Sequence, residues 1–141
     1  MSLLSSFKVA GTGLLAQSTR LNTVASNMAN AETASSDEAT VYQARKVIFE
    51  AELNSASTGR AKSAVSVNSK EVVLSDAPAK RVYNPAHPMA DKEGYVFMPN
   101  VDIGEEMVEM ISSSRSYQMN AEVMNTSKQL LMKTLGIGEG S

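Results

Sequence analysis

Few residues of this 141-residue chain could do chemistry, and their spacing argues against catalysis. His87 is the single histidine and there is no cysteine, so a zinc site of imidazole and thiolate ligands cannot be completed. The prolines that flank this histidine favour a structural or surface role for it. Three carboxylates, Glu105, Glu106 and Glu109, lie together, but they fall at the predicted start of a helix, where acidic residues complement the helix dipole. The serines at 112–114 lack a base that could activate them.

The composition excludes several other classes of function. The chain has neither a glycine-rich phosphate loop after a strand nor a GxSxG motif, and its nine methionines are better explained by packing than by a cofactor. We therefore expect no enzymatic activity, cofactor, metal or small-molecule substrate. A net charge of −2 provides no basic surface for nucleic acid. No apolar run approaches the ~20 residues of a membrane span, and no cleavable signal peptide is evident.

The longest uninterrupted element is a predicted helix from Asp102 to Leu135. A helix of this length would extend over roughly 50 Å at about 1.5 Å per residue. Asp102 is expected to cap its first turn, with Glu105 returning the bond as in a capping box. Gly136 and Gly138 are expected to end it. A helix this long needs a partner helix, either in the same chain or in another molecule.

Heptad spacing within this helix predicts the partner-facing side. Two interleaved series have members seven residues apart, and such series form the seam of a coiled coil. They are Met110, Tyr117, Met124 and Leu131, and Met107, Ser114, Ala121, Lys128 and Leu135. Small residues in the second series would let two helices approach closely.

Residues 1–31 form a second predicted helix with the same kind of seam. Its two series are Leu4, Gly11, Ser18 and Ala25, and Phe7, Leu14, Leu21 and Met28. Two glycines weaken this helix by roughly 1 kcal/mol each relative to alanine, so its helicity should depend on packing. Periodicity favours packing within the chain, while a seam between molecules remains the alternative.

The residues between the two helices predict short strands and turns. Residues 41–53, 79–83 and 95–97 each favour a strand, and residues 65–74 favour two short β pieces. Residues 31–40 are polar and predict a loop, and residues 54–64 predict a flexible loop tip. Three prolines in 85–99 predict an extended connection to the second helix.

The expected fold is therefore α+β, with long N- and C-terminal helices paired as a coiled coil and a small β-rich insertion between them. We divide the chain into the N-terminal helix (1–33), a β-rich insertion (34–81), a proline-rich connector (82–101) and the C-terminal helix (102–141).

Several stretches resemble the axial proteins of the bacterial flagellum. SNMANAET at 26–33 is similar to a signature shared by rod, hook and hook-associated proteins. Residues 82–138, including NPAHPMA, GYVFMPNVD and SRSYQMN, resemble the C-terminal half of the proximal-rod type, and the opening LLSSFKVAGTGLLAQSTRLN agrees. Residues 34–79 match less well. The SSDEAT insertion after the signature differs from hook and distal-rod relatives and fits the proximal-rod type.

The resemblance implies a structural subunit that assembles by helix packing into the drive shaft and export channel of the basal body. Implied partners are other rod proteins, the adaptor between the rod and the MS ring, the MS-ring protein and copies of the same chain. It implies a rod within the periplasm, reached through the flagellar type III export channel without a cleaved signal peptide. The expected interface comprises the apolar and small members of the four series together with Asn27 and Asn30 of the signature.

An alternative from a different class is a soluble helical-hairpin adaptor or export chaperone. Such a protein would satisfy both helix seams internally and would be a folded, highly helical monomer or dimer. The rod interpretation instead predicts low helicity and protease-sensitive ends in the isolated chain, because the helices would become ordered on assembly. Circular dichroism of the isolated protein separates the two.

Overall fold

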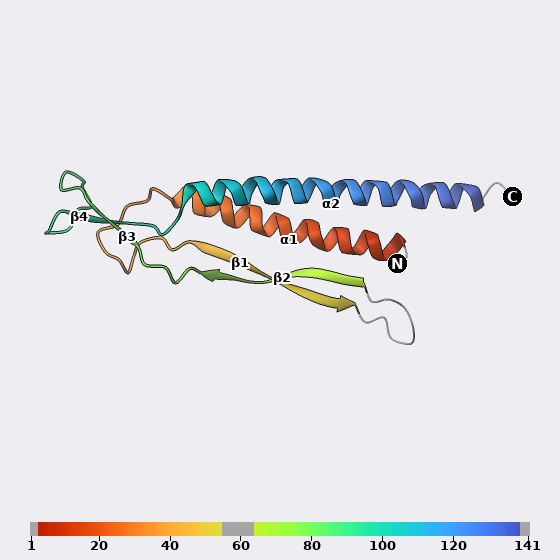
Figure 1. The fold of residues 1–141 in the computed structure, drawn as a ribbon, viewed down its shortest axis with the longest axis horizontal. Coiled ribbons are helices and arrows are strands. Elements are labelled where there is room, and N and C mark those ends of the chain that lie inside the picture. Colours follow the sequence, from red (N-terminus) through yellow and green to blue (C-terminus); the bar gives the residue numbers. More distant parts are fainter. Residues whose placement is uncertain (1–2, 55–63, 139–141) are drawn as a thin grey trace. The chain divides into compact units, whose positions relative to one another are not determined.

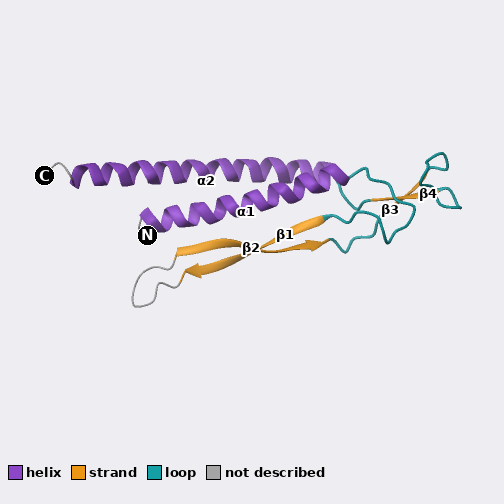
Figure 2. Ribbon diagram, turned by 180° about the vertical axis from the view of Figure 1, so that it is seen from behind, coloured by secondary structure: helices purple, strands orange, loops and turns teal. Residues whose placement is uncertain are grey.

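The computed structural model describes residues 3–54 and 64–138, and it has the expected α+β architecture. Two long helices, α1 (Leu3–Asn30) and α2 (Ile103–Gly138), precede and follow four strands along the chain, in the order α1–β1–β2–β3–β4–α2 (Figure 1). The strands pair two by two (Figure 2): β1 (Arg45–Asn54) with β2 (Ala64–Leu74), and β3 (Lys80–Tyr83) with β4 (Tyr95–Met98). Most of the predicted loop tip lies outside the described residues. Among the described helices, none is both long and apolar enough to cross a membrane.

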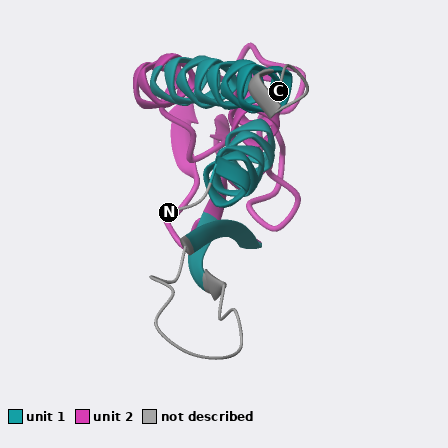
Figure 3. Cartoon of the chain, turned by 90° about the vertical axis from the view of Figure 1, so that its right-hand side faces the viewer, with its two compact units in different colours: residues 1–19, 48–71, 112–141 teal, residues 20–47, 72–111 magenta. Residues whose placement is uncertain are grey.

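The chain forms two compact units, and each takes part of both helices and of the β1–β2 hairpin (Figure 3). Unit 1 comprises Met1–Thr19, Ile48–Glu71 and Ser112–Ser141, and unit 2 comprises Arg20–Val47 and Val72–Ile111. The two helices pair antiparallel within each unit. In unit 1, Gly11 lies beside Met124 and Gly13 beside Asn120; in unit 2, Arg20 pairs with Glu109 and Asn27 with Glu106.

Small residues allow close helix approach in unit 1. A Cβ on Gly13 would lie 2.9 Å from Nδ2 of Asn120, closer than side chains normally approach one another. Ala10 and Ala16 on the same helix are buried. The β1–β2 hairpin also contacts α1 here, because the backbone N–H of Val67 donates to the hydroxyl of Thr12 at 3.4 Å. Glycine at position 13 therefore lowers the helix propensity of α1 but allows α2 to approach closely.

Helix α2 begins as predicted and ends later than predicted. Oδ1 of Asp102 accepts bonds from the N–H groups of Gly104 (2.8 Å) and Glu105 (3.3 Å), as an N-cap does. Among the described residues, the Glu105 carboxylate makes no return bond to Asp102, so only half of the expected capping box forms. Of the two glycines expected to end the helix, Gly136 does not, and α2 continues to Gly138. An exposed glycine in a helix costs about 1 kcal/mol and does not forbid continuation.

The strands depart from the prediction at two places. β1 begins at Arg45 rather than at 41, because the residues before it are held by side chains instead of a strand partner. The two short pieces predicted in 65–74 form one continuous strand, β2. The loop expected over 31–40 is present as turns, with a single bridge from Ser35 to Phe97 at the edge of β4.

The expected extended connector contains an antiparallel hairpin. β3 pairs with β4 in the register Lys80 to Met98 and Tyr83 to Tyr95. Gly94 has φ of 83°, and a Cβ there would lie 2.9 Å from the ring of Tyr83, so the turn requires glycine. The guanidinium of Arg81 lies 4.0 Å from the ring centre of Tyr95 and pairs with the carboxylate of Glu93 at 2.8 Å. These contacts hold β3, whose four residues are all exposed, against β4.

The apolar core of unit 2 is small. Ala31, Ala44 and Val101 are buried together, with Tyr42 packed against them. The other buried apolar side chains of unit 2, Val24, Val41 and Val96, are also small, so hydrogen bonds are needed to define how these segments meet. Buried polar residues near the end of α1, Thr23 and Asn27, are placed to make such bonds.

Candidate assembly site

The residues predicted to form the assembly interface are distributed between half-buried and exposed positions. Half-buried members are Gly11, Leu14, Ser18, Leu21, Met28, Asn30, Met110, Ser114, Ala121, Met124 and Leu131. Exposed members are Leu4, Phe7, Ala25, Met107, Tyr117 and Leu135. Asn27 is the one member that is fully buried, at 1 % exposure. The caps Asp102 and Glu105 are exposed.

The more buried rows of both helices lie one residue before two of the predicted series. On α1 they are Leu3, Ala10, Gln17 and Val24; on α2 they are Glu106, Ser113, Asn120 and Ser127. The α2 row is entirely polar, and the hydroxyl of Ser113 has no hydrogen-bond partner although it is buried. The prediction placed both seams one residue later and therefore missed these rows.

Large apolar side chains lie on the outside of both helices. On α1, Leu4 and Leu15 are 69 % and 71 % exposed. On α2 the exposed set is Ile103, Met107, Val108, Ile111, Tyr117, Met119, Val123, Leu130, Met132 and Leu135. Single exposed apolar residues are ordinary, but a set of this size along one helix indicates a surface that binds a partner.

Asn27 is the centre of a hydrogen-bond network in unit 2, which we call the Asn27 node. Its Nδ2 donates to the backbone oxygen of Arg45 and to Oε1 of Glu106, both at 2.8 Å. Its Oδ1 accepts from the hydroxyl of Tyr42 and from the N–H of Arg45, both at 2.9 Å. All four hydrogen-bonding positions of the amide are thus used, as burial of a polar group requires. Ser26 of the same signature lies 3.2 Å from the Tyr42 hydroxyl.

A second asparagine makes a similar arrangement, which we call the Asn100 clamp. Oδ1 of Asn100 accepts from the N–H of Ala44 at 2.7 Å, and its Nδ2 donates to the backbone oxygens of Ser75 (3.3 Å) and Ala77 (2.7 Å). Sequence reasoning did not select Asn100, Tyr42 or Arg45, because each lies outside the heptads. The only available signal was the asparagine itself, next to a proline and ahead of a helix cap.

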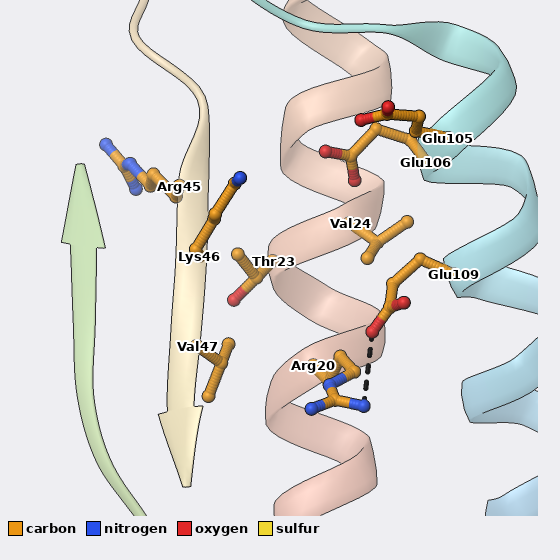
Figure 4. A pocket seen from close by; sticks show the side chains of 9 residues that line it. All are labelled: Arg20, Thr23, Val24, Arg45, Lys46, Val47, Glu105, Glu106 and Glu109. Carbon is orange, nitrogen blue, oxygen red and sulfur yellow. Dashed lines mark ion pairs between the residues drawn. The ribbon is translucent and has the colours of Figure 1, made fainter. Parts of the chain in front are cut away.

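Charged residues line a cavity of about 290 Å³ beside the Asn27 node (Figure 4). Its walls come from α1, the start of β1 and the first turns of α2. Arg20 and Glu109 form an ion pair at 3.1 Å across the two helices. The other charged members are Arg45, Lys46, Glu105 and Glu106. With three basic and three acidic side chains, the cavity is neutral when all are ionised.

The Glu106 carboxyl has a shifted pKa. Burial raises the pKa of its carboxyl above the ordinary value; the bond from Asn27 lowers it, and the like charge of Glu109 raises it. The acidic cluster therefore does more than complement the helix dipole, because one of its carboxylates completes the Asn27 node. Within the described ranges, no group of three potential ligands is arranged to hold a metal ion.

Two protein-family models match this chain, one over most of α1 and the other over most of α2. A family model described as "Flagella basal body rod protein" matches residues 7–34, which include the Asn27 signature. A second, described as "Flagellar basal body rod FlgEFG protein C-terminal", matches residues 92–137, which include nearly all of α2. The matched regions are those that supply Asn27 and Glu106.

Full-length relatives extend the match over the whole chain. The flagellar basal-body rod protein FlgC of Salmonella typhimurium is 48 % identical over 99 % of this chain and 100 % of its own length. FlgC of Escherichia coli O157:H7 is also 48 % identical with the same coverage, and that of Borreliella burgdorferi is 35 % identical, again over 99 % and 100 %. The chain belongs to the FlgC family of flagellar basal-body rod proteins.

Proposed function

We propose that this chain is a structural subunit of the proximal rod of the flagellar basal body and has no enzymatic role. It assembles by packing its terminal helices against those of neighbouring subunits. The observation that carries the proposal is the row of large apolar side chains on the outer faces of α1 and α2. A chain that worked alone would place most such side chains between its helices, whereas here the more buried row of α2 is entirely polar and that of α1 has only Leu3 and Val24 as large apolar members.

Assembly would offset the cost of ordering both helices. Burial of apolar surface contributes about 25 cal/mol per Å², and one fully buried leucine or methionine contributes roughly 1.5–3 kcal/mol. Several such side chains in each copy supply a driving force that the small core of unit 2 does not. The half-buried and exposed members of the predicted interface, Leu21 and Met107 among them, would then become buried between subunits.

The family membership supports the choice of partners. We propose contacts with copies of the same chain, other rod proteins, the adaptor between the rod and the MS ring, and the MS-ring protein itself. The assembled helices would form the wall of the drive shaft and of the export channel inside it. The rod would lie within the periplasm, and each subunit would arrive through the export channel with its N-terminal helix uncleaved.

Leu15 provides a direct test, because this residue is 71 % exposed and a charge there should not disturb the single chain. We expect Leu15→Glu to match the wild-type circular dichroism spectrum in dilute solution, where neither chain associates, but to be missing from purified basal bodies of a strain that lacks its own copy. Burying an unpaired carboxylate between subunits would prevent packing. Ala39→Glu, which adds the same charge at an exposed loop position, should assemble and restore swimming. Equal incorporation of both variants would contradict the proposal.

A further inference from the structure

Two consecutive backbone N–H groups, at the point where the chain enters β1, are held by different asparagines. The N–H of Ala44 donates to Oδ1 of Asn100 at 2.7 Å, and the N–H of Arg45 donates to Oδ1 of Asn27 at 2.9 Å. The two asparagines come from different parts of unit 2. Asn100 precedes α2 in the chain, whereas Asn27 lies in the last turns of α1.

The Asn100 clamp needs neither helix. Besides Ala44, the side chain of Asn100 binds the backbone oxygens of Ser75 and Ala77, which follow β2. The N–H of Ser75 also donates to the backbone oxygen of Ala44 at 2.7 Å. All of these groups belong to residues between the two helices, so the clamp can form whenever these segments meet.

The Asn27 node, in contrast, requires both helices. Asn27 is presented by α1, and the second hydrogen of its Nδ2 is satisfied only by Glu106 in the first turns of α2. With α1 unfolded the amide is no longer held in place, and with α2 unfolded its second Nδ2 hydrogen loses its acceptor, which weakens the node. The ion pair between Arg20 and Glu109 holds the same two helix segments together.

We propose that residues 44–45 form a two-stage latch, in which Asn100 holds the base of the β1–β2 hairpin at all times and Asn27 closes on it only when α1 and α2 pair. Asn27 is thus a positioning residue, through which the pairing of the two helices holds the start of β1 in place. The latch itself rests on the geometry of unit 2, and its use during assembly rests on the proposed rod function.

The latch also explains why an amide is required at position 27. An aspartate could accept the bonds from Tyr42 and Arg45 but could not donate to the Arg45 oxygen, and its charge would repel Glu106. A leucine would fill the space but leave four polar partners unsatisfied. The amide of Asn27 has two hydrogens to donate, to Glu106 and to the Arg45 oxygen, and an oxygen that accepts from the strand, so one side chain contacts both α2 and β1.

Amide hydrogen exchange at these two neighbouring residues tests the latch in the labelled full-length chain. Under conditions where circular dichroism shows both helices formed, we expect Glu106→Ala and Asn27→Asp to raise exchange at Arg45 at least tenfold and to leave Ala44 within about twofold. Asn100→Ala should have the reverse pattern. Glu106→Gln retains an acceptor for Asn27 and should keep Arg45 protected, which separates loss of the latch from general loosening.

A second experiment on the wild-type chain varies how far the two helices are formed. In dilute solution, where the helices are less formed, Arg45 should exchange at least tenfold faster than in the helical state while Ala44 remains protected. If the two amides exchange equally in the wild type and respond equally to every variant, the latch is overturned, and residues 44–45 then belong to one cooperative unit. This result would leave the rod function untouched, because that function is tested by incorporation of Leu15→Glu into basal bodies.

Discussion

At the residue scale, buried and half-buried polar side chains align segments that apolar side chains align in larger cores. Asn27 and Asn100 each join three segments that the small core of unit 2 could not align by itself. Hydrogen bonds of this kind contribute about 1 kcal/mol each, but they are directional and therefore specify one arrangement. Glu106 differs from the two asparagines, because burial raises its pKa and the folded chain therefore disfavours its ionised form.

Glu106→Gln should stabilise the chain at neutral pH, by less than about 1 kcal/mol because the carboxylate is partly solvated. Glutamine keeps an acceptor for Asn27 and removes repulsion from Glu105 and Glu109. A carboxyl whose folded-state pKa is raised favours folding below the ordinary value near 4.3, and this contribution is lost as the pH rises through the raised pKa. Urea unfolding should therefore show a difference between variant and wild type at pH 7 that disappears near pH 4.

The pH control uses a residue whose shift has the opposite sign. Bonds from backbone N–H groups, first that of Tyr95, lower the pKa of Asp91. Its contribution is present above the ordinary aspartate pKa and is lost as the pH falls through the lowered value. Both chains retain Asp91, so this loss cancels in their difference. A stability difference between them that is unchanged from pH 7 to pH 4 would contradict the assignment to Glu106.

At the element scale, the sequence predicted both helices closely because their signals are local. A capping aspartate, an acidic first turn and long heptads set the start of α2, and Asp102 caps it as expected. The start of β1 and the identity of the buried rows could not be predicted in the same way. They depend on Asn27, Asn100 and Tyr42 meeting residues far away in the sequence, and on which face of each helix packs inward.

The cap offers a prediction for α2 alone. Asp102→Ala removes the acceptor for the N–H groups of Gly104 and Glu105 and should lower the free energy of unfolding by about 1 kcal/mol. Asp102→Asn keeps a capping oxygen and should recover most of that loss, whereas a pure charge effect would leave the two variants equal. Denaturant unfolding monitored by far-ultraviolet circular dichroism measures both.

At the scale of the whole molecule, the distribution of side-chain size is inverted relative to a self-contained helical hairpin. Polar Ser113, Asn120 and Ser127 form the more buried row of α2, while Met119, Met132 and Leu135 lie outside, each more than 60 % exposed. Such a chain gains most from burial only when neighbours cover its outer faces. Helix formation and association should therefore be linked.

The helicity of the isolated chain should accordingly rise with its concentration. In dilute solution we expect the far-ultraviolet signal to fall well below that of α1 and α2 fully formed, because short-range packing alone supports them weakly. Sedimentation on the same samples should show association over the same concentration range. A monomer that is fully helical and unfolds cooperatively at all concentrations would instead favour the helical-hairpin adaptor.

The outward placement of large side chains also changes how sequence tolerance should be judged. In most small proteins a residue's solvent exposure ranks how freely it can be replaced. Under the proposed function that ranking fails for this chain, since Leu4, Leu15 and Met132 would be surface residues during synthesis and transport but interior residues of the finished organelle. Selection for motility would restrict these positions as strictly as Val24, while selection for the stability of one chain would scarcely affect them.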